Sequence, residues 1–96
     1  MQKSSSRNTE GAEVIALKAL GFLAEEPERL QRFMDLSGLG LEAIRAGAAD
    51  PGFLSGVFDH ILADQTLLLL FAESLQLSPE KIAQMRRQLP GASLDF

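Results

Sequence analysis

The chain has 96 residues, of which 46% are hydrophobic and 23% charged, and it contains no cysteine. This length supports one hydrophobic core rather than two independent domains, and the missing cysteines exclude disulfide and thiol chemistry. The net charge is −4 overall and −6 beyond residues 1–8, which hold Lys3 and Arg7 and no acid. We therefore expect the folded part to be repelled by nucleic-acid backbones and by anionic membrane surfaces.

The sequence shows no secretory signal and no membrane-spanning segment. Residues 1–8 are polar and lack the apolar stretch of a signal peptide. The apolar run Leu67–Phe71 has five residues, whereas about 18 to 20 are needed to cross a bilayer. We therefore expect a cytoplasmic protein, and a chain without cysteine fits a reducing compartment.

A first helix is predicted from Thr9, acting as N-cap, to about Ala24, and residues 1–8 are expected to form a disordered tail. Glu10 and Glu13 then lie near the positive end of the helix dipole. Apolar side chains cover most of this helix, so we expect it to be central and packed on several sides. These apolar residues are Val14, Ile15, Leu17, Leu20, Phe22 and Leu23.

Two shorter helices should follow. Pro27 suits the first turn of a second helix, because a residue there needs no N–H for the helix ladder. Gly38 is a natural residue to end it. A third helix is expected from Leu41 to about Ala46, with Leu41 and Ile44 as its apolar residues.

The last three helices have clear start signals. Asp50 before Pro51 predicts the fourth helix, Asp64 can cap a fifth over Gln65–Leu75, and Ser78 before Pro79 predicts a sixth that ends at Pro90. The fourth has one apolar face, formed by Phe53, Leu54, Val57, Phe58, Ile61 and Leu62. In the sixth, Ile82, Met85 and Leu89 should point inward. No segment alternates as a strand would.

These elements predict an all-α fold, a compact bundle of about six short helices forming one domain over residues 9–90, with a frayed C-terminus over 91–96.

The two halves of the chain also resemble each other. With a shift of 39, residues 22–25 pair with 61–64, and after one residue of slippage Phe33 pairs with Phe71 and Ile44 with Ile82. Either two related three-helix units pack together, or two amphipathic segments rich in Leu and Ala match by chance.

The sequence contains no recognisable catalytic constellation. His60, the only histidine, has Asp64 four residues later, but the chain lacks the further histidine or cysteine that a zinc site would use. We instead expect Asp64 to be a helix cap and His60 to lie near the end of the fourth helix. No serine lies in a nucleophile elbow and no glycine-rich phosphate loop is present. We therefore predict no catalytic residue, no metal site and no cofactor.

A helix-turn-helix nucleic-acid binder is a weaker alternative. The turn around Gly38 to Gly40 resembles the connection of such a motif. The third helix carries little more than Arg45 to read bases. The sixth helix carries more side chains that could read bases, namely Lys81, Gln84, Arg86, Arg87 and Gln88. Basic residues near a helix C-terminus have an ordinary explanation in the helix dipole, and the acidic body disfavours the alternative.

The apolar run in the predicted fifth helix is the most informative feature for function. Five consecutive apolar residues cover all sides of a helix, so this helix is either fully enclosed or exposes apolar surface for a protein interface. The residues of this candidate interface are Leu67, Leu68, Leu69, Leu70 and Phe71.

Several short segments resemble a known family. They are Pro27-Glu28-Arg29-Leu30 with Phe33, Gly38-Leu39, Arg45-Ala46, Asp50-Pro51-Gly52-Phe53-Leu54, Val57-Phe58-Asp59, Asp64 and Phe71-Ala72. Over about residues 12 to 89 the chain resembles a family of small bacterial proteins catalogued as a domain of unknown function. The resemblance implies a small, helical, bacterial and cytoplasmic protein, and it brings no activity, cofactor or catalytic residue.

We therefore expect a non-enzymatic interaction module that uses apolar surface of the fifth helix and the edge of the fourth. Its partner would be another protein or a second copy in a homodimer. The alternative is a carrier of a small apolar ligand, with a pocket between the two half-units, and the further alternative is the nucleic-acid binder.

Overall fold

A computed structural model describes the backbone of residues 3–90 and the side chains of residues 11–90. These residues form six α-helices and no strand, so the predicted all-α bundle is confirmed. The helices are α1 (Lys3–Ala24), α2 (Pro27–Ser37), α3 (Leu41–Gly47), α4 (Pro51–Leu62), α5 (Gln65–Leu75) and α6 (Pro79–Arg86).

The capping residues that the sequence predicted for the last three helices are confirmed. Asp50 accepts a hydrogen bond from the Gly52 amide at 3.3 Å, and Asp64 accepts one from the Leu67 amide at 3.2 Å. The Ser78 hydroxyl accepts a hydrogen bond from the Lys81 amide at 3.1 Å. These side chains satisfy amides that the first turn of a helix leaves unpaired.

The predicted start of the first helix at Thr9 is wrong, because α1 begins six residues earlier at Lys3. The segment between Lys3 and Glu10 contains neither proline nor glycine. Adding residues to an existing helix is easier than nucleating one, so α1 extends into this segment. The expected tail over residues 1–8 therefore overlaps α1 except at residues 1 and 2. Those two residues and the expected frayed end over 91–96 lie outside the described residues.

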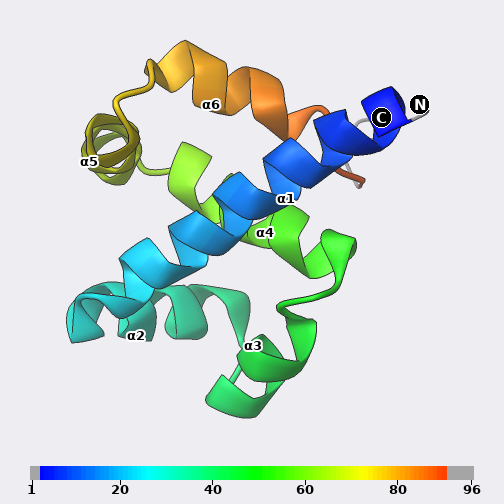
Figure 1. The fold of residues 1–96 in the computed structure, drawn as a ribbon. Helices are drawn as coiled ribbons and strands as arrows, with labels where there is room; N and C mark the ends of the chain where they lie inside the picture. The colour runs from blue at the N-terminus through cyan, green and yellow to red at the C-terminus, as the bar shows by residue number, and fades with distance from the viewer. Residues whose placement is uncertain (1–2, 91–96) are drawn as a thin grey trace.

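The core is built around the crossing of α1 over α4 (Figure 1). The face of α1 that packs on α4 is narrow and consists mainly of alanine, with Ala12, Ala16 and Ala19 each at most 1% exposed. Alanine at this spacing lets the two helix backbones approach closely. The large side chains come from α4, where Leu54, Val57, Phe58 and Ile61 are buried.

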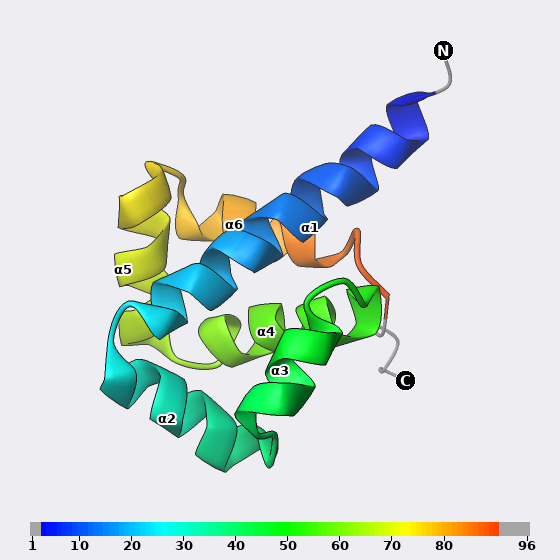
Figure 2. The same ribbon diagram turned by 60° about the horizontal axis from the view of Figure 1, so that its bottom comes forward.

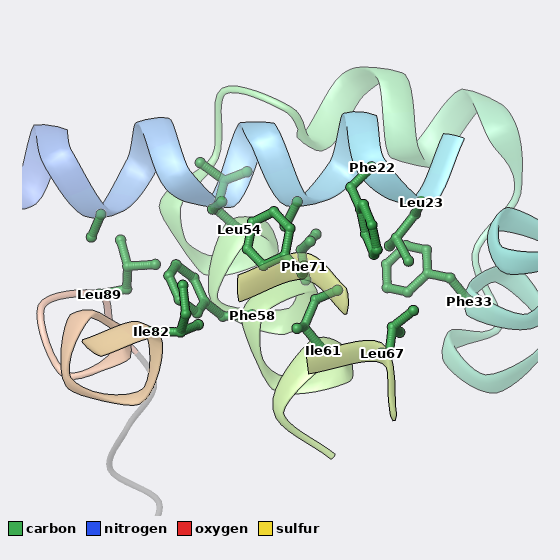
Figure 3. Packing of buried hydrophobic residues seen from close by; sticks show 14 of the residues in the cluster. Phe22, Leu23, Phe33, Leu54, Phe58, Ile61, Leu67, Phe71, Ile82 and Leu89 are labelled. Carbon is green, nitrogen blue, oxygen red and sulfur yellow. The ribbon is translucent and has the colours of Figure 1, made fainter. Parts of the chain in front are cut away.

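The other helices surround this crossing. In both views α6 lies on one side of it and α2 and α3 lie on the other (Figures 1 and 2). One hydrophobic cluster joins residues from all six helices. Figure 3 shows this core as a continuous layer below α1, from Leu89 and Ile82 at one end to Phe33 and Leu67 at the other. Each of these four side chains is at most 8% exposed.

The two halves of the chain repeat the same helix pattern with a constant offset of 38 residues. The ends of α1 and α4, both ends of α2 and α5, and the starts of α3 and α6 all differ by this number. The residues with left-handed backbone conformation that follow α2 and α5 are also 38 positions apart. They are Gly38 (φ 76°) and Gln76 (φ 59°). The shift of 39 predicted for residues 22–25 is therefore wrong, and no slippage is needed. A shift of 39 pairs residues of similar type, but it does not pair residues at the same position in their helices. With a shift of 38, Leu23 pairs with Ile61, and both side chains are fully buried.

No single helix among residues 3–90 is both long and apolar enough to cross a membrane. Helices α4 and α5 together have that length and composition, but they are bent by 109° at their junction.

The two equivalent helix ends give a paired prediction. Glycine adopts a positive φ without the Cβ strain that costs other residues about 1–2 kcal/mol. We therefore expect Gln76→Gly to raise the free energy of unfolding by about 1 kcal/mol and Gly38→Ala to lower it by about 1 kcal/mol. A Cβ at Gly38 would meet no atom within 4 Å, so this loss would come from the backbone alone. Urea denaturation followed by circular dichroism measures both changes in the free energy of unfolding. Shifts of the same sign would contradict a positive φ at both Gly38 and Gln76.

Candidate functional site

The apolar run Leu67–Phe71 is divided between the core and the surface. Leu67 and Phe71 are buried, at 8% and 1% exposure, and Leu68 is half-buried against the core. Leu69 and Leu70 are 48% and 43% exposed. Successive residues of a helix are about 100° apart, so the run covers an inward and an outward face of α5. Of the five candidate residues, Leu69 and Leu70 are thus the two exposed to solvent.

The edge of α4 contributes less apolar surface than expected, because Phe53 and Leu62 are half-buried against the core. Large apolar side chains are exposed instead on α1, where Val14 is 48% and Leu17 is 44% exposed. Helix α1 does pack against α4, α2 and α6, as expected of a central helix, but its outward face is not covered by the described residues. Its buried alanines recur at helical spacing, and this pattern in the sequence marks the face that packs against α4.

A pocket of about 490 Å³ lies between α1 and α5, and we call it the α1/α5 groove. Its floor contains Phe22 and Phe71, whose ring centroids are 5.3 Å apart. Arg29 closes one end, with its guanidinium 4.1 Å from the centre of the Phe22 ring and donating a hydrogen bond to the Phe22 carbonyl at 3.3 Å. The sides are formed by α1 residues Lys18 and Gly21, by Glu25 directly after α1, and by α5 residues Leu70, Ser74 and Leu75.

A second pocket, of about 340 Å³, occupies the equivalent place between α4 and α2, and we call it the α4/α2 groove. All seven residues that line it are equivalent, at an offset of 38, to residues of the α1/α5 groove. They are Phe33, Leu36, Ser37, Gly56, Asp59, His60 and Ala63. The aromatic pairs correspond too, since the ring centroids of Phe33 and His60 are 5.0 Å apart. Such reciprocal contacts are typical of a twofold arrangement, so the predicted pairing of two three-helix units describes the geometry.

His60 occupies the position equivalent to Phe22 and borders both the α4/α2 groove and a third pocket of about 320 Å³, which is also lined by Arg29, Arg32 and Asp64. Burial, followed by the nearby Arg32 guanidinium, lowers the pKa of His60 below its ordinary value of 6.5, and Asp64 acts in the opposite direction. The buried Nε2 atom has no hydrogen-bond partner among the described residues. Neutral histidine is therefore the favoured form.

The His60 and Asp64 pair does not extend to a metal centre in the described part of the chain. Asp64 caps α5, as predicted, and no group of three His, Cys, Asp or Glu residues in this part is arranged to hold a metal ion. No donor set for metal chemistry is therefore found around His60.

The basic residues of α6 and α3 are partly engaged within the fold. Arg86 donates to both carboxylate oxygens of Asp59, at 2.7 and 3.1 Å, and also to the carbonyls of Leu89 and Pro90. Arg45 forms an exposed ion pair with Glu42 at 3.8 Å. The Arg86 contact attaches α6 to the outer face of α4, so this guanidinium has a structural role.

Comparison with known proteins identifies one family. The family model described as "Protein of unknown function (DUF3572)" matches residues 9–92. No curated protein and no solved structure matches the chain. The resemblance seen in the sequence is therefore confirmed.

The equivalence of His60 and Phe22 predicts the effect of His60→Phe. The substitution keeps an aromatic ring against Phe33 and removes a buried nitrogen without a partner, so we expect the free energy of unfolding to rise by about 1 kcal/mol at neutral pH. As the pH falls through about 6.5, the unfolded wild-type chain binds a proton more readily than the folded chain, whose His60 pKa is lowered. Wild type should therefore begin to lose stability as the pH falls through about 6.5, and the loss should continue until the pH is below the lowered pKa of folded His60.

Urea denaturation at several pH values tests this prediction. The gap between His60→Phe and wild type should widen toward acid pH. A constant gap would show that His60 does not titrate differently in the folded and unfolded chains.

Proposed function

Because the chain belongs to the family described as "Protein of unknown function (DUF3572)", whose description assigns no reaction, we propose a function from its surface. The protein is a non-enzymatic interaction module that receives an amphipathic helix of a protein partner in the α1/α5 groove. The observation that carries the proposal is this groove, which has Phe22 and Phe71 at its floor and the exposed Leu70 at its side. The bacterial and cytoplasmic setting implied by the family resemblance belongs to the same proposal.

Exposed apolar residues are found on both helices. Leu70 lines the groove on the α5 side and is 43% exposed. Val14 lies one helical turn before Lys18 on the same face of α1 and is 48% exposed. Contiguous exposed apolar surface in a small protein usually marks an interaction site.

The α1/α5 groove is the larger of the two equivalent grooves, at about 490 Å³ against about 340 Å³, which favours it as the site, although Leu36, 66% exposed, gives the α4/α2 groove an apolar side as well. Arg32 stands at the position equivalent to Leu70, and Asp59 stands at the position equivalent to Gly21. Asp59 is bound to Arg86, so its outer face is covered by a polar contact. Gly21 leaves open space, since a Cβ there would meet no atom within 4 Å.

The groove has the features of helix-in-groove recognition. An amphipathic helix inserts apolar side chains over an apolar floor and leaves its polar face to the rim. Here Phe22 and Phe71 form the floor, and Lys18 and Glu25 are exposed at the rim. A carrier of a small apolar ligand has weaker support, because the three pockets open to solvent and are bordered by charged side chains.

Photo-crosslinking at two equivalent positions tests the proposal. Ser74 in the α1/α5 groove and Leu36 in the α4/α2 groove are related by the 38-residue offset, and both are exposed. A photo-reactive amino acid at position 74 should give a discrete protein adduct in native cells, and the same amino acid at position 36 should not.

Adding Leu70→Asp should reduce the position-74 adduct at least tenfold, because a carboxylate would have to be desolvated in an apolar contact. The helical circular dichroism should not change, since Leu70 is exposed. Equal adducts at positions 74 and 36, or an adduct insensitive to Leu70→Asp, would refute the proposal.

A further inference from the structure

The outward face of α1 has a pattern that suits pairing with a second α1. Val14, Leu17, Gly21 and Ala24 recur at alternating spacings of three and four residues, as the a and d positions of a heptad do. All four are exposed. The two large residues lie in the N-terminal part of this face and the two small residues lie in the C-terminal part.

We infer that the occupant of the α1/α5 groove is the α1 helix of a second copy of this chain, lying antiparallel to the first in a symmetric dimer. This inference rests on the proposed function and names the partner. In antiparallel pairing centred near Ala19, Leu17 of one copy lies opposite Gly21 of the other, and Val14 lies opposite Ala24. The twofold axis makes each of these contacts twice.

The shape of the surface fits this arrangement. A Cβ added to Gly21 would meet no atom within 4 Å, so there is room above this residue for a leucine side chain. Gly21 also lines the α1/α5 groove together with Leu70. The incoming Leu17 would therefore lie over glycine and beside an apolar residue of α5.

The charges fit the same register. Lys18 in α1 and Glu25 directly after it both lie on the side of the apolar seam that lines the groove, seven residues apart as successive e positions of a heptad are. In antiparallel pairing centred near Ala19, Lys18 is level with Leu20 of the other copy, and its long side chain extends along the seam to Glu25 of that copy, giving two reciprocal ion pairs. Neither side chain forms an ion pair with any of residues 11–90 of its own chain.

Filling the space at Gly21 is the first test. Gly21→Leu should leave the monomer folded, because the new side chain enters open space and leucine favours helix more than glycine. It should weaken dimerisation at least tenfold, because it collides with Leu17 of the second copy. Gly56→Leu is the matched control, since Gly56 is also an exposed helical glycine with no atom within 4 Å of its Cβ. Sedimentation equilibrium gives the dissociation constants, and equal constants for the two variants would overturn the inference.

Charge reversal tests the register. Lys18→Glu and Glu25→Lys should each weaken self-association, because like charges then meet in both pairs. An equimolar mixture of the two variants should form a heterodimer with an affinity close to that of wild type, because opposite charges meet again. A mixture that stays monomeric would overturn the antiparallel arrangement.

The results also separate this inference from the proposed function. A wild-type chain that is monomeric at every concentration, with a position-74 adduct to a different protein, would overturn the dimer and keep the interaction module. A position-74 adduct of twice the chain mass supports both.

Discussion

The crossing of α1 over α4 is the contact on which the other helices depend. The buried face of α1 is narrow and consists mainly of alanine, and α4 supplies the large side chains Leu54, Phe58 and Ile61. Close approach of the two backbones places the neighbouring helices against both sides of the pair. The narrowness of the alanine face has a second effect, because it leaves the opposite side of α1, with Val14 and Leu17, without a cover from the described part of the chain.

The two halves of the chain have the same helix arrangement, but the equivalent outer faces of α1 and α4 make different contacts. In the second half, Asp59 and Arg86 join α4 to α6, so the outer face of α4 contributes to the stability of the fold. In the first half, Gly21 occupies the place of Asp59, and α3 makes no comparable contact with α1. The face of α4 at Asp59 is thus covered by an ion pair, whereas the equivalent face of α1 at Gly21 is open to solvent.

Local signals in the sequence predicted most of the helix boundaries. Asp50, Asp64 and Ser78 bond to amides within three residues of themselves, and Gly38 adopts its left-handed conformation within its own turn. Such features depend on short-range chemistry and can be read from the chain. The start of α1 could not be predicted in this way, because a plausible cap at Thr9 competes with continued helix growth.

The candidate site was less accessible to sequence analysis. The run Leu67–Phe71 indicated α5 correctly as a helix with apolar residues on all sides, but its division into buried and exposed residues depends on where α1 lies. The exposed apolar face of α1 was missed because hydrophobicity alone does not separate a covered face from an exposed one, and the alanine spacing carried that information. The environment of His60 depends on Phe33 and Arg32 from α2 and could not be derived from neighbours in the sequence.

The constant offset between the halves also affects how the chain can fold. Equivalent positions of α1 and α4 are 38 residues apart, so their contact requires closure of a loop of that length before either apolar face is covered. The helices that follow α1 have 7 to 12 residues, and helices of this length are marginal in water by themselves. During synthesis the alanine face of α1 would therefore leave the ribosome before the large side chains of α4 that cover it, and the core could be completed only after α4 has emerged.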